Sequence, residues 1–270
     1  MRSKDTAEEL SEQDGPIRED TLLGGRVRFF QPEYGYRVGI DPVILASAVP
    51  EGRAGHVLDV GSGTGAAALC LLSRMPLDRI SGIEWNATYA EMSRDSLRIN
   101  GYDAVSEIIC ADLRTKPPQI PGSVFDVVIT NPPYHTTGTR SPDRGRSVAH
   151  MEGIPLKQWI DFCLRCLRPG GIFVVIHRAD RLQSLLHALW GRAGAIDVIP
   201  LWPRAGVDAK RVIVRAKKGS TAPVKMVFGL VLHTSNGSEF TAATQMILRE
   251  GKGLDEALAS QALSIAADAG

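Results

Sequence analysis

The feature that most constrains the fold of this chain is an alternation of strand-like and helical stretches between residues 56 and 218. Apolar runs such as HVLDV, RISGIE, FDVVIT and IFVVIH are typical of buried strands, and amphipathic stretches such as NATYAEMSRDSLRIN are typical of helices. The runs AIDVIPLW and KRVIVRAK predict an antiparallel pair at one edge. Strands that alternate with helices of this length predict an α/β fold with a doubly wound, mainly parallel sheet.

Local signals place several helix ends. Asp41 is expected as the N-cap of a short helix, with Pro42 at its first position. Asn86 is expected to cap the helix after the second strand, and Gly101 to stop it. Four tryptophans are expected mostly in the core, with Trp85 and Trp202 as the exceptions.

The composition is that of an ordinary globular protein. The 270 residues are 44% hydrophobic and 23% charged, which fits one α/β domain with extensions. No apolar run reaches the roughly 18 residues of a transmembrane helix, and the start MRSKD predicts no signal peptide. Four cysteines make no disulfide framework, and Cys163-x-x-Cys166 is interpreted as buried thiol rather than a metal site. We therefore expect a cytoplasmic protein without membrane or metal partners.

Charge is unevenly distributed along the chain. Residues 140–225 hold 16 Lys or Arg against 6 Asp or Glu, a balance of +10 within a chain of net charge +1. A basic half predicts a polyanionic partner, although scattered solvated charge is an equally good interpretation of the count alone.

A glycine-rich turn follows the first strand of the alternation. In LDVGSGTG, Asp59 precedes three glycines at alternate positions, Gly61, Gly63 and Gly65. Such a turn brings backbone close to a ligand beyond the carboxyl ends of the strands, although it can also serve tight helix packing. The spacing is G-x-G-x-G rather than the dinucleotide G-x-G-x-x-G, so NAD binding is the less favoured alternative.

Acidic residues close the next two strands. Glu84 ends the second strand, where a carboxylate can accept hydrogen bonds from both hydroxyls of a ribose. Asp112 follows the third strand in CADLR and is placed to accept from an exocyclic adenine amine. Each acid alone is as often a helix cap, but the set favours a nucleoside ligand.

The fourth strand ends in the sequence NPPYH, residues 131–135. Two successive prolines fix two φ angles and hold the residue before each of them extended. Taken alone, the motif is interpreted as a rigid surface turn; after the glycine turn, we interpret it as part of a site.

With DVGSGTG, GIEWN, ADLR and NPPY in this order, the chain resembles the class I S-adenosylmethionine-dependent methyltransferases over about residues 55–218. The resemblance implies a Rossmann-like, seven-stranded sheet that is mostly parallel with an antiparallel C-terminal strand, and S-adenosylmethionine as cofactor. It implies that the glycine turn contacts the methionine part of the cofactor, that Glu84 binds the ribose, that Trp85 lies beside the adenine, and that Asp112 and the Leu113 backbone read the adenine amine.

The NPPY motif resembles that of methyltransferases acting on planar amino groups. The resemblance implies that the Asn131 side chain and the Pro132 carbonyl accept the two N–H bonds of the target amine, while Tyr134 stacks on the flipped base. Asn131 is thereby expected at the boundary of the cofactor and the substrate. Methyl transfer would be an in-line displacement that depends on positioning and electrostatics.

A closer resemblance covers about residues 24–250. QPEYGYRVGIDPVILASAV, NPPYHTTG, IHRADRL and PLWPRAGVDAKRVIV look like the bacterial tRNA (adenine-N6)-methyltransferases of the anticodon-flanking adenine in valine tRNA. By this likeness Asp41 lies near the methionine end of the cofactor. Many members read Ala-Arg-His-Glu where this chain has Ala149-His150-Met151-Glu152, which leaves the RNA contact of that segment open.

These resemblances imply tRNA as the partner and leave the oligomeric state open. The expected RNA contacts are Pro133, His135, Arg140, Arg144, Arg146, His150, Arg178, Arg204, Lys210 and Arg211. Two alternatives stay open: the same chemistry on another planar amine (rRNA guanine N2, DNA adenine N6 or protein glutamine), and a non-catalytic RNA-binding protein with the cofactor fold.

The expected domain division has four segments. They are residues 1–22 as a disordered acidic tail, 23–54 as an N-terminal extension packing on the catalytic domain, 55–250 as the methyltransferase domain, and 251–270 as a flexible or weakly helical tail.

Overall fold

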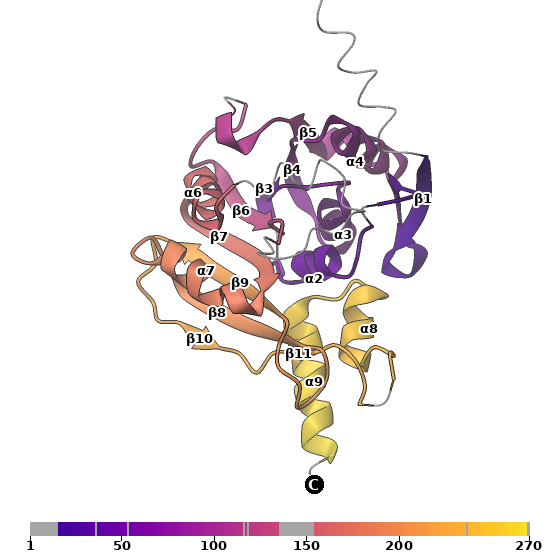
Figure 1. The fold of residues 1–270 in the computed structure, drawn as a ribbon, viewed down its shortest axis with the longest axis vertical. Coiled ribbons are helices and arrows are strands. Elements are labelled where there is room, and N and C mark those ends of the chain that lie inside the picture. Colours follow the sequence, from indigo (N-terminus) through magenta and orange to yellow (C-terminus); the bar gives the residue numbers. More distant parts are fainter. Residues whose placement is uncertain are drawn as a thin grey trace, which may run out of the picture.

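A computed structural model describes residues 16–35, 37–52, 54–115, 117, 119–134, 154–235 and 237–268. Figure 1 shows a central sheet between helices, with the C-terminal helices beneath it. None of the helices in this described part of the chain has the length and apolar character needed to cross a membrane.

The central sheet follows the expected pattern. Its main strands are β3 (Ala54–Val60), β4 (Leu77–Glu84), β5 (Ser106–Cys110), β6 (Phe125–Thr130), β7 (Leu167–Arg178), β8 (Ala193–Trp202) and β9 (Arg211–Lys218). Within the described residues the strand order is β8-β9-β7-β6-β3-β4-β5, and only β9 runs antiparallel to its neighbours. The short strands β10 (Lys225–Met226) and β11 (Leu230–Val231) add to β8. The predicted sheet with its antiparallel C-terminal strand is confirmed.

Helices cover both faces of the sheet. They are α2 (Asp41–Ser47), α3 (Ala66–Arg74), α4 (Ala87–Ile99), α6 (Leu156–Cys166), α7 (Leu182–Leu189), α8 (Ala242–Leu248) and α9 (Leu254–Asp268). In Figure 1, α2, α3 and α4 lie on one side and α6 and α7 on the other. Alternate strand residues point to opposite faces, so Val57 joins the core of the first group and Leu58 that of the second.

Local signals explain several helix ends. The Asn86 side chain accepts a hydrogen bond from the Tyr89 amide at 3.0 Å, so the predicted cap of α4 is confirmed. The N-cap of α2, however, is Ile40, and Asp41 is its first helical residue. The prediction of Asp41 as N-cap was wrong by one position, because its carboxylate is used elsewhere, as described below.

The N-terminal residues form a hairpin. Strand β1 (Ile17–Leu22) pairs with β2 (Val27–Pro32), and Glu19 accepts two hydrogen bonds from Arg28. The Phe30 amide donates to Ser96 on α4 at 2.9 Å, which fastens the hairpin to the sheet domain. The segment Ile17–Leu22, expected to belong to an acidic tail, is therefore an ordered strand, because its cross-strand partners satisfy its backbone.

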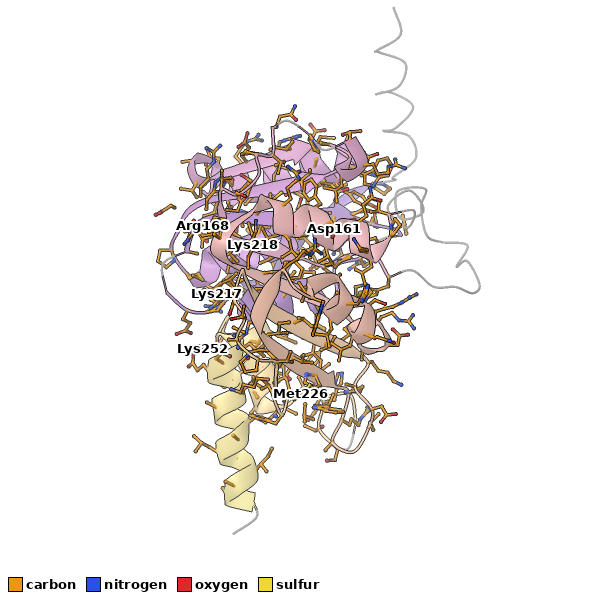
Figure 2. The ribbon with its side chains drawn as sticks, turned by 90° about the vertical axis from the view of Figure 1, so that its left-hand side faces the viewer. Asp161, Arg168, Lys217, Lys218, Met226 and Lys252 are labelled. Atoms are coloured by element: carbon orange, nitrogen blue, oxygen red, sulfur yellow. The ribbon has the colours of Figure 1, made fainter. Side chains whose placement is uncertain are left out.

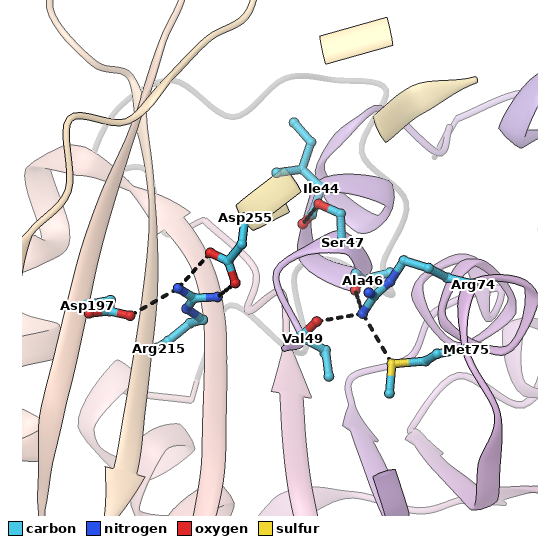
Figure 3. A network of polar contacts seen from close by, with 9 residues as sticks. All are labelled: Ile44, Ala46, Ser47, Val49, Arg74, Met75, Asp197, Arg215 and Asp255. Atoms are coloured by element: carbon cyan, nitrogen blue, oxygen red, sulfur yellow. Dashed lines mark hydrogen bonds and ion pairs between the residues drawn. The ribbon is translucent and has the colours of Figure 1, made fainter. Parts of the chain in front are cut away.

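The C-terminal helix is docked rather than weakly formed. Leu254, Ala257 and Leu258 of α9 are buried in the core. Arg215 of β9 contacts Asp255 on α9 at 2.7 Å and Asp197 on β8 at 3.0 Å, as Figure 3 shows. The sequence alone does not reveal this ion-pair network because its members are far apart in the chain.

A second arginine fixes α2. Arg74, at the end of α3, donates to the carbonyl oxygens of Ala46 at 3.1 Å and of Val49 at 2.6 Å (Figure 3). The Ala46 carbonyl lies in the last turn of α2 and the Val49 carbonyl just beyond it, so these bonds hold the end of α2 against α3. Because α2 and α3 both border the candidate site, this lock holds two of its walls.

Candidate functional site

A pocket opens at the carboxyl edge of the sheet, where β3 and β6 end. Residues from four segments line it: Pro42, Leu45, Asp59, Gly61, Ser62, Thr64, Ala66, Ala67 and Asn131. The glycine turn and the first residue of the NPPY motif therefore border one space, as predicted from the sequence.

The glycine turn has the backbone that its sequence indicates. Gly61, Gly63 and Gly65 have φ angles of 73°, 55° and 84°, in the left-handed region that favours glycine. The amides of Gly61 and Ser62 both donate to the Ile83 carbonyl, at 2.9 and 3.0 Å, so β4 holds the turn. A Cβ atom at Gly65 would lie 2.4 Å from the Ser93 hydroxyl, because α3 and α4 approach closely there.

Asp59, the second-last residue of β3, has a buried side chain. Burial raises the pKa of Asp59 to about 7, the charge of Glu84 adds to the rise, and a bond from the Ala68 amide opposes it. Among the described residues that line the pocket, Asp59 Oδ2 and the hydroxyls of Ser62 and Thr64 are buried without a hydrogen-bond partner. Because these atoms border the pocket, they are available to polar groups of a ligand.

Glu84 is held by backbone amides. Its two carboxylate oxygens accept from Gly63 at 2.8 Å and from Asn86 at 2.9 Å, which fixes the side chain beside the turn. Burial raises the pKa of Glu84, and the amide donors of Asn86, Gly63 and Trp85 oppose the rise. Each oxygen keeps a further lone pair, so the carboxylate can also accept from a diol.

The third predicted acid lies at the same edge. Asp112 follows β5 and pairs with Arg114, which contacts it through Nε at 2.9 Å and through Nη2 at 2.5 Å. Leu113 is buried and Trp85 is partly buried. The expected roles of these three residues toward an adenine stay a prediction.

The NPPY motif follows strand β6, whose last residue is held by two side-chain hydrogen bonds. The Thr130 hydroxyl donates to the Val60 carbonyl at 2.7 Å and accepts from Trp159 Nε1 of α6 at 2.8 Å. Pro132 is buried, while Asn131 and Pro133 are partly exposed. Of the motif's residues, Asn131 lines the pocket, directly after this anchored strand.

Tyr134 is tied to a distant part of the chain. Its hydroxyl donates to Asp41 Oδ2 at 2.8 Å, and Arg211 Nε donates to the same oxygen at 2.5 Å. The Tyr134 ring lies 5.2 Å from the His177 ring, tilted by 56°. Burial and the Asp41 charge raise the pKa of Tyr134.

The predicted RNA contacts divide into several groups. His135, Arg140, Arg144, Arg146 and His150 lie outside the described residues. Arg178 pairs with Asp180, Arg204 donates to the Gly237 carbonyl at 2.6 Å, and Lys210 is exposed. All three lie at the carboxyl edge, because β7 and β8 end there and β9 begins there. Arg211 lies at the same edge, but its guanidinium is bound to Asp41.

Other cations of the basic half lie far from this edge. Arg168 is the second residue of β7, whereas Lys217 and Lys218 end the antiparallel β9, so all three lie at the amino edge (Figure 2). The charge count over residues 140–225 therefore mixes two opposite edges of the sheet. Trp190, expected in the core, is 85% exposed after α7.

Comparison with known proteins decides the family. The model of the methyltransferase small domain family matches residues 37–197, more than half of the chain. The chain belongs to this family. This methyltransferase is 31% identical over 214 residues to the tRNA1(Val) (adenine(37)-N6)-methyltransferase of Porphyromonas gingivalis, covering 74% of this chain and 83% of the relative. The protein of the same name from Aeromonas hydrophila is 29% identical over 206 residues, covering 75% and 84%.

Solved structures agree with the fold of this methyltransferase. A structure described as a predicted O-methyltransferase from Agrobacterium tumefaciens matches with a TM-score of 0.66 and 27% identity, covering 79% of this chain and 97% of that one. A 16S rRNA N2 methyltransferase of T. thermophilus, in complex with AdoMet and guanosine, matches with a TM-score of 0.53 and 24% identity, covering 75% and 50%. The methyltransferase class and the Rossmann-like fold predicted from the sequence are confirmed.

Some residues of this methyltransferase site were missed from the sequence. Pro42 and Leu45 line the pocket because α2 lies across it, and only the final fold shows that contact. Ser62 and Thr64 stand between the predicted glycines, so a polar residue inside a glycine turn is the signal that was available. The bond from Tyr134 to Asp41 had no sequence signal, since the two residues lie 93 positions apart.

Proposed function

We propose that this methyltransferase transfers the methyl group of S-adenosylmethionine to the exocyclic N6 of an adenine in tRNA, the anticodon-flanking adenine of valine tRNA. The observation that carries the proposal is the place of Asn131. It lines the pocket beside the glycine turn and is also the first residue of the NPPY motif. A target amine held by Asn131 therefore lies next to whatever the pocket binds.

The pocket and the Glu84 carboxylate beside the glycine turn suit the proposed cofactor. The buried, unpartnered oxygens of Asp59, Ser62 and Thr64 suit the charged amino-acid end of S-adenosylmethionine, and the fixed Glu84 carboxylate suits its ribose. When bound, S-adenosylmethionine supplies an electrophilic methyl group on its sulfonium.

The residues of the NPPY motif bind the target amine. The Asn131 side-chain oxygen and the Pro132 carbonyl accept hydrogen bonds from the two N–H groups of the amine. These bonds favour a pyramidal nitrogen whose lone pair is no longer delocalised into the ring. Thr130, bonded to both Val60 and Trp159, keeps these acceptors from moving. Fixed acceptors of this kind lower the barrier by pre-organisation rather than by strong basicity.

The assignment of tRNA as the substrate is supported by the names of the relatives and by the basic residues at the carboxyl edge of the sheet. Two relatives that match over about three quarters of this chain are named for adenine N6 in valine tRNA. Arg178, Arg204 and Lys210 lie on the same edge as Asn131, where phosphate contacts would add affinity that falls with salt. A tRNA substrate also implies work in the cytoplasm.

Methyl transfer from labelled S-adenosylmethionine to tRNA, rRNA, DNA and protein tests the proposal. Nucleoside analysis of the labelled product should yield N6-methyladenosine from tRNA alone, and a valine tRNA transcript whose target adenine is replaced by guanosine should stay unlabelled. Label in N2-methylguanosine, in DNA or in protein would refute the substrate assignment.

A substitution in the motif tests the chemistry. Asn131→Ala removes one amine acceptor, so we expect kcat to fall by about a hundredfold or more. The Kd for S-adenosylmethionine, measured by calorimetry, should change by less than about fivefold, because Asn131 is one lining residue among several. A variant that keeps its turnover would contradict the role of Asn131.

A further inference from the structure

The side chain of Tyr134 is held at its hydroxyl and at its ring. The hydroxyl donates to Asp41 Oδ2 at 2.8 Å, and the ring packs at 5.2 Å against the ring of His177. His177 is itself fixed, since it is 2% exposed and its Nδ1 accepts from the Arg178 amide at 2.8 Å. A free tyrosine at a loop mouth would be able to rotate about χ1, whereas this one has a single supported position.

The carboxylate that holds Tyr134 is itself held. Arg211, the first residue of β9, contacts Asp41 Oδ2 at 2.5 Å, and the Asp41 side chain is only 11% exposed. A carboxylate this well buried needs a cationic partner, and Arg211 supplies it. The Nε atom of Arg211 is therefore bound within the protein, while its side chain stays 37% exposed and its expected role in RNA binding stays a prediction.

Three segments that are distant in sequence meet at this contact. Asp41 begins α2, Tyr134 follows β6 and Arg211 begins β9. Two further residues of α2, Pro42 and Leu45, line the pocket. The same short helix therefore borders the pocket and orients the aromatic residue of the motif.

We propose that Asp41, held in place by Arg211, is a positioning residue that fixes the ring of Tyr134 for stacking on the target base. The proposal rests on the proposed function for the identity of the base, but the tether itself is a property of the free protein. Two sequence-based expectations stay predictions beside it: Asp41 as a contact of the cofactor's methionine end and Arg211 as an RNA contact.

The tether is tested first in the free protein by fluorine NMR. The chain has five tyrosines, and labelling with 3-fluorotyrosine gives each a signal; the Tyr134 signal is the one lost in Tyr134→Phe. In Asp41→Ala and in Arg211→Ala this signal should move or broaden, because the hydroxyl loses its acceptor or the acceptor loses its support. An unchanged Tyr134 signal in both variants would overturn the tether, whatever the enzyme methylates.

The effect on catalysis is tested with a double-mutant cycle. Asp41→Ala should lower kcat/KM for tRNA about tenfold in the wild-type background and by less than about twofold in the Tyr134→Phe background. Asp41→Asn keeps an acceptor for the hydroxyl and should recover part of the loss. Additive losses would overturn the proposal, as would a loss of S-adenosylmethionine affinity beyond about fivefold in Asp41→Ala that persists with Tyr134→Phe.

Control variants and the wild-type enzyme separate the outcomes. Asp95 and Arg98 form an exposed ion pair on α4, so Asp95→Ala and Arg98→Ala repeat the chemical changes away from the site and should leave both readouts unchanged. If the wild-type enzyme labels another amine instead of tRNA adenine, the proposed function fails, and the same cycle is then run on that amine. The tether fails only through an unmoved Tyr134 signal, additive losses or the persistent cofactor defect.

Discussion

Asp59 carries a carboxyl group whose charge state depends on what fills the pocket. With Oδ2 buried and unpartnered within the described structure, and with the Glu84 carboxylate nearby, it holds its proton to about pH 7. A cationic group of a bound ligand would favour the ionised form and lower this pKa. At the scale of single residues, the free protein therefore carries a desolvated carboxyl group, and a cationic ligand group would offset that desolvation.

Replacing Asp59 by Asn should make the stability of the free protein less dependent on pH. The folded pKa of about 7 exceeds the unfolded value, so between pH 4 and 7 the unfolded chain releases its proton first, and the unfolding free energy of the wild type falls as pH rises. The stability gained by Asp59→Asn should therefore grow by about 2 kcal/mol between pH 5 and pH 8. Urea unfolding at both pH values measures it.

The control for this exchange is Asp103→Asn, at an exposed position. A gain from Asp59→Asn that is the same at both pH values would mean that its cause is packing rather than ionisation. The expected cost appears on binding, since the variant cannot offer a negative charge to S-adenosylmethionine.

The residues of the site were predictable to the extent that their signal is local. Gly61, Gly63, Gly65 and Glu84 were identified because strand ends in a parallel sheet share one edge. Asp41 was assigned to a helix cap, since the sequence around it fits that role, and its bond to Tyr134 depends on a contact that no local pattern records. Local chemistry predicts which residue types matter; the partner of each depends on the assembled fold.

Among the elements, α3 and α4 approach each other closely at their junction. The turn into α3 passes so close to α4 that Gly65 has the Ser93 hydroxyl where a Cβ would lie. The strands and helices were predicted well because their apolar periods are regular. The hairpin strand β1 was missed because IREDTL is mostly exposed and has no apolar alternation.

A comparison of two glycines separates the effect of backbone strain at residue 65 from the effect of its steric contact with α4. Gly65→Ala and Gly101→Ala both place alanine at a positive φ, 84° and 76°, but a Cβ at Gly101 has nothing within 4 Å. We expect a loss of about 1 kcal/mol for Gly101→Ala and about 3 kcal/mol or more for Gly65→Ala. Thermal unfolding measures both.

Ser93→Ala added to Gly65→Ala should recover part of the loss, since it removes the nearest atom. Equal losses at the two glycines, or no recovery, would show that the close approach of α4 does not limit residue 65.

At the scale of the whole molecule, the C-terminal segment closes the core. Helix α9 contributes three buried apolar residues and the buried Gln261, which accepts from the Val231 amide at 2.9 Å and donates to the Gly229 carbonyl at 2.9 Å. From Ala262 to Ala267 the side chains are exposed. The weak apolar pattern of this segment led to the expectation of a tail, although half of the helix is structural.

Two truncations test this division of α9. Ending the chain after Gly253 removes Leu254, Leu258 and the Asp255 partner of Arg215, and should destabilise the protein by about 5 kcal/mol or more. Ending it after Ala262 removes exposed residues and should cost less than about 1 kcal/mol. Urea unfolding of both forms decides, and equal losses would contradict the division.

The hydroxyl of Thr130 also fixes the point from which the NPPY motif starts. It joins β6 to the end of β3 through Val60 and to α6 through Trp159, so the depth of the motif in the site is set just before Asn131. For protein engineering, this anchor sets the depth at which any side chain at position 131 meets the pocket, so an exchange there should change the chemistry of the pocket lining without moving the strand that carries it.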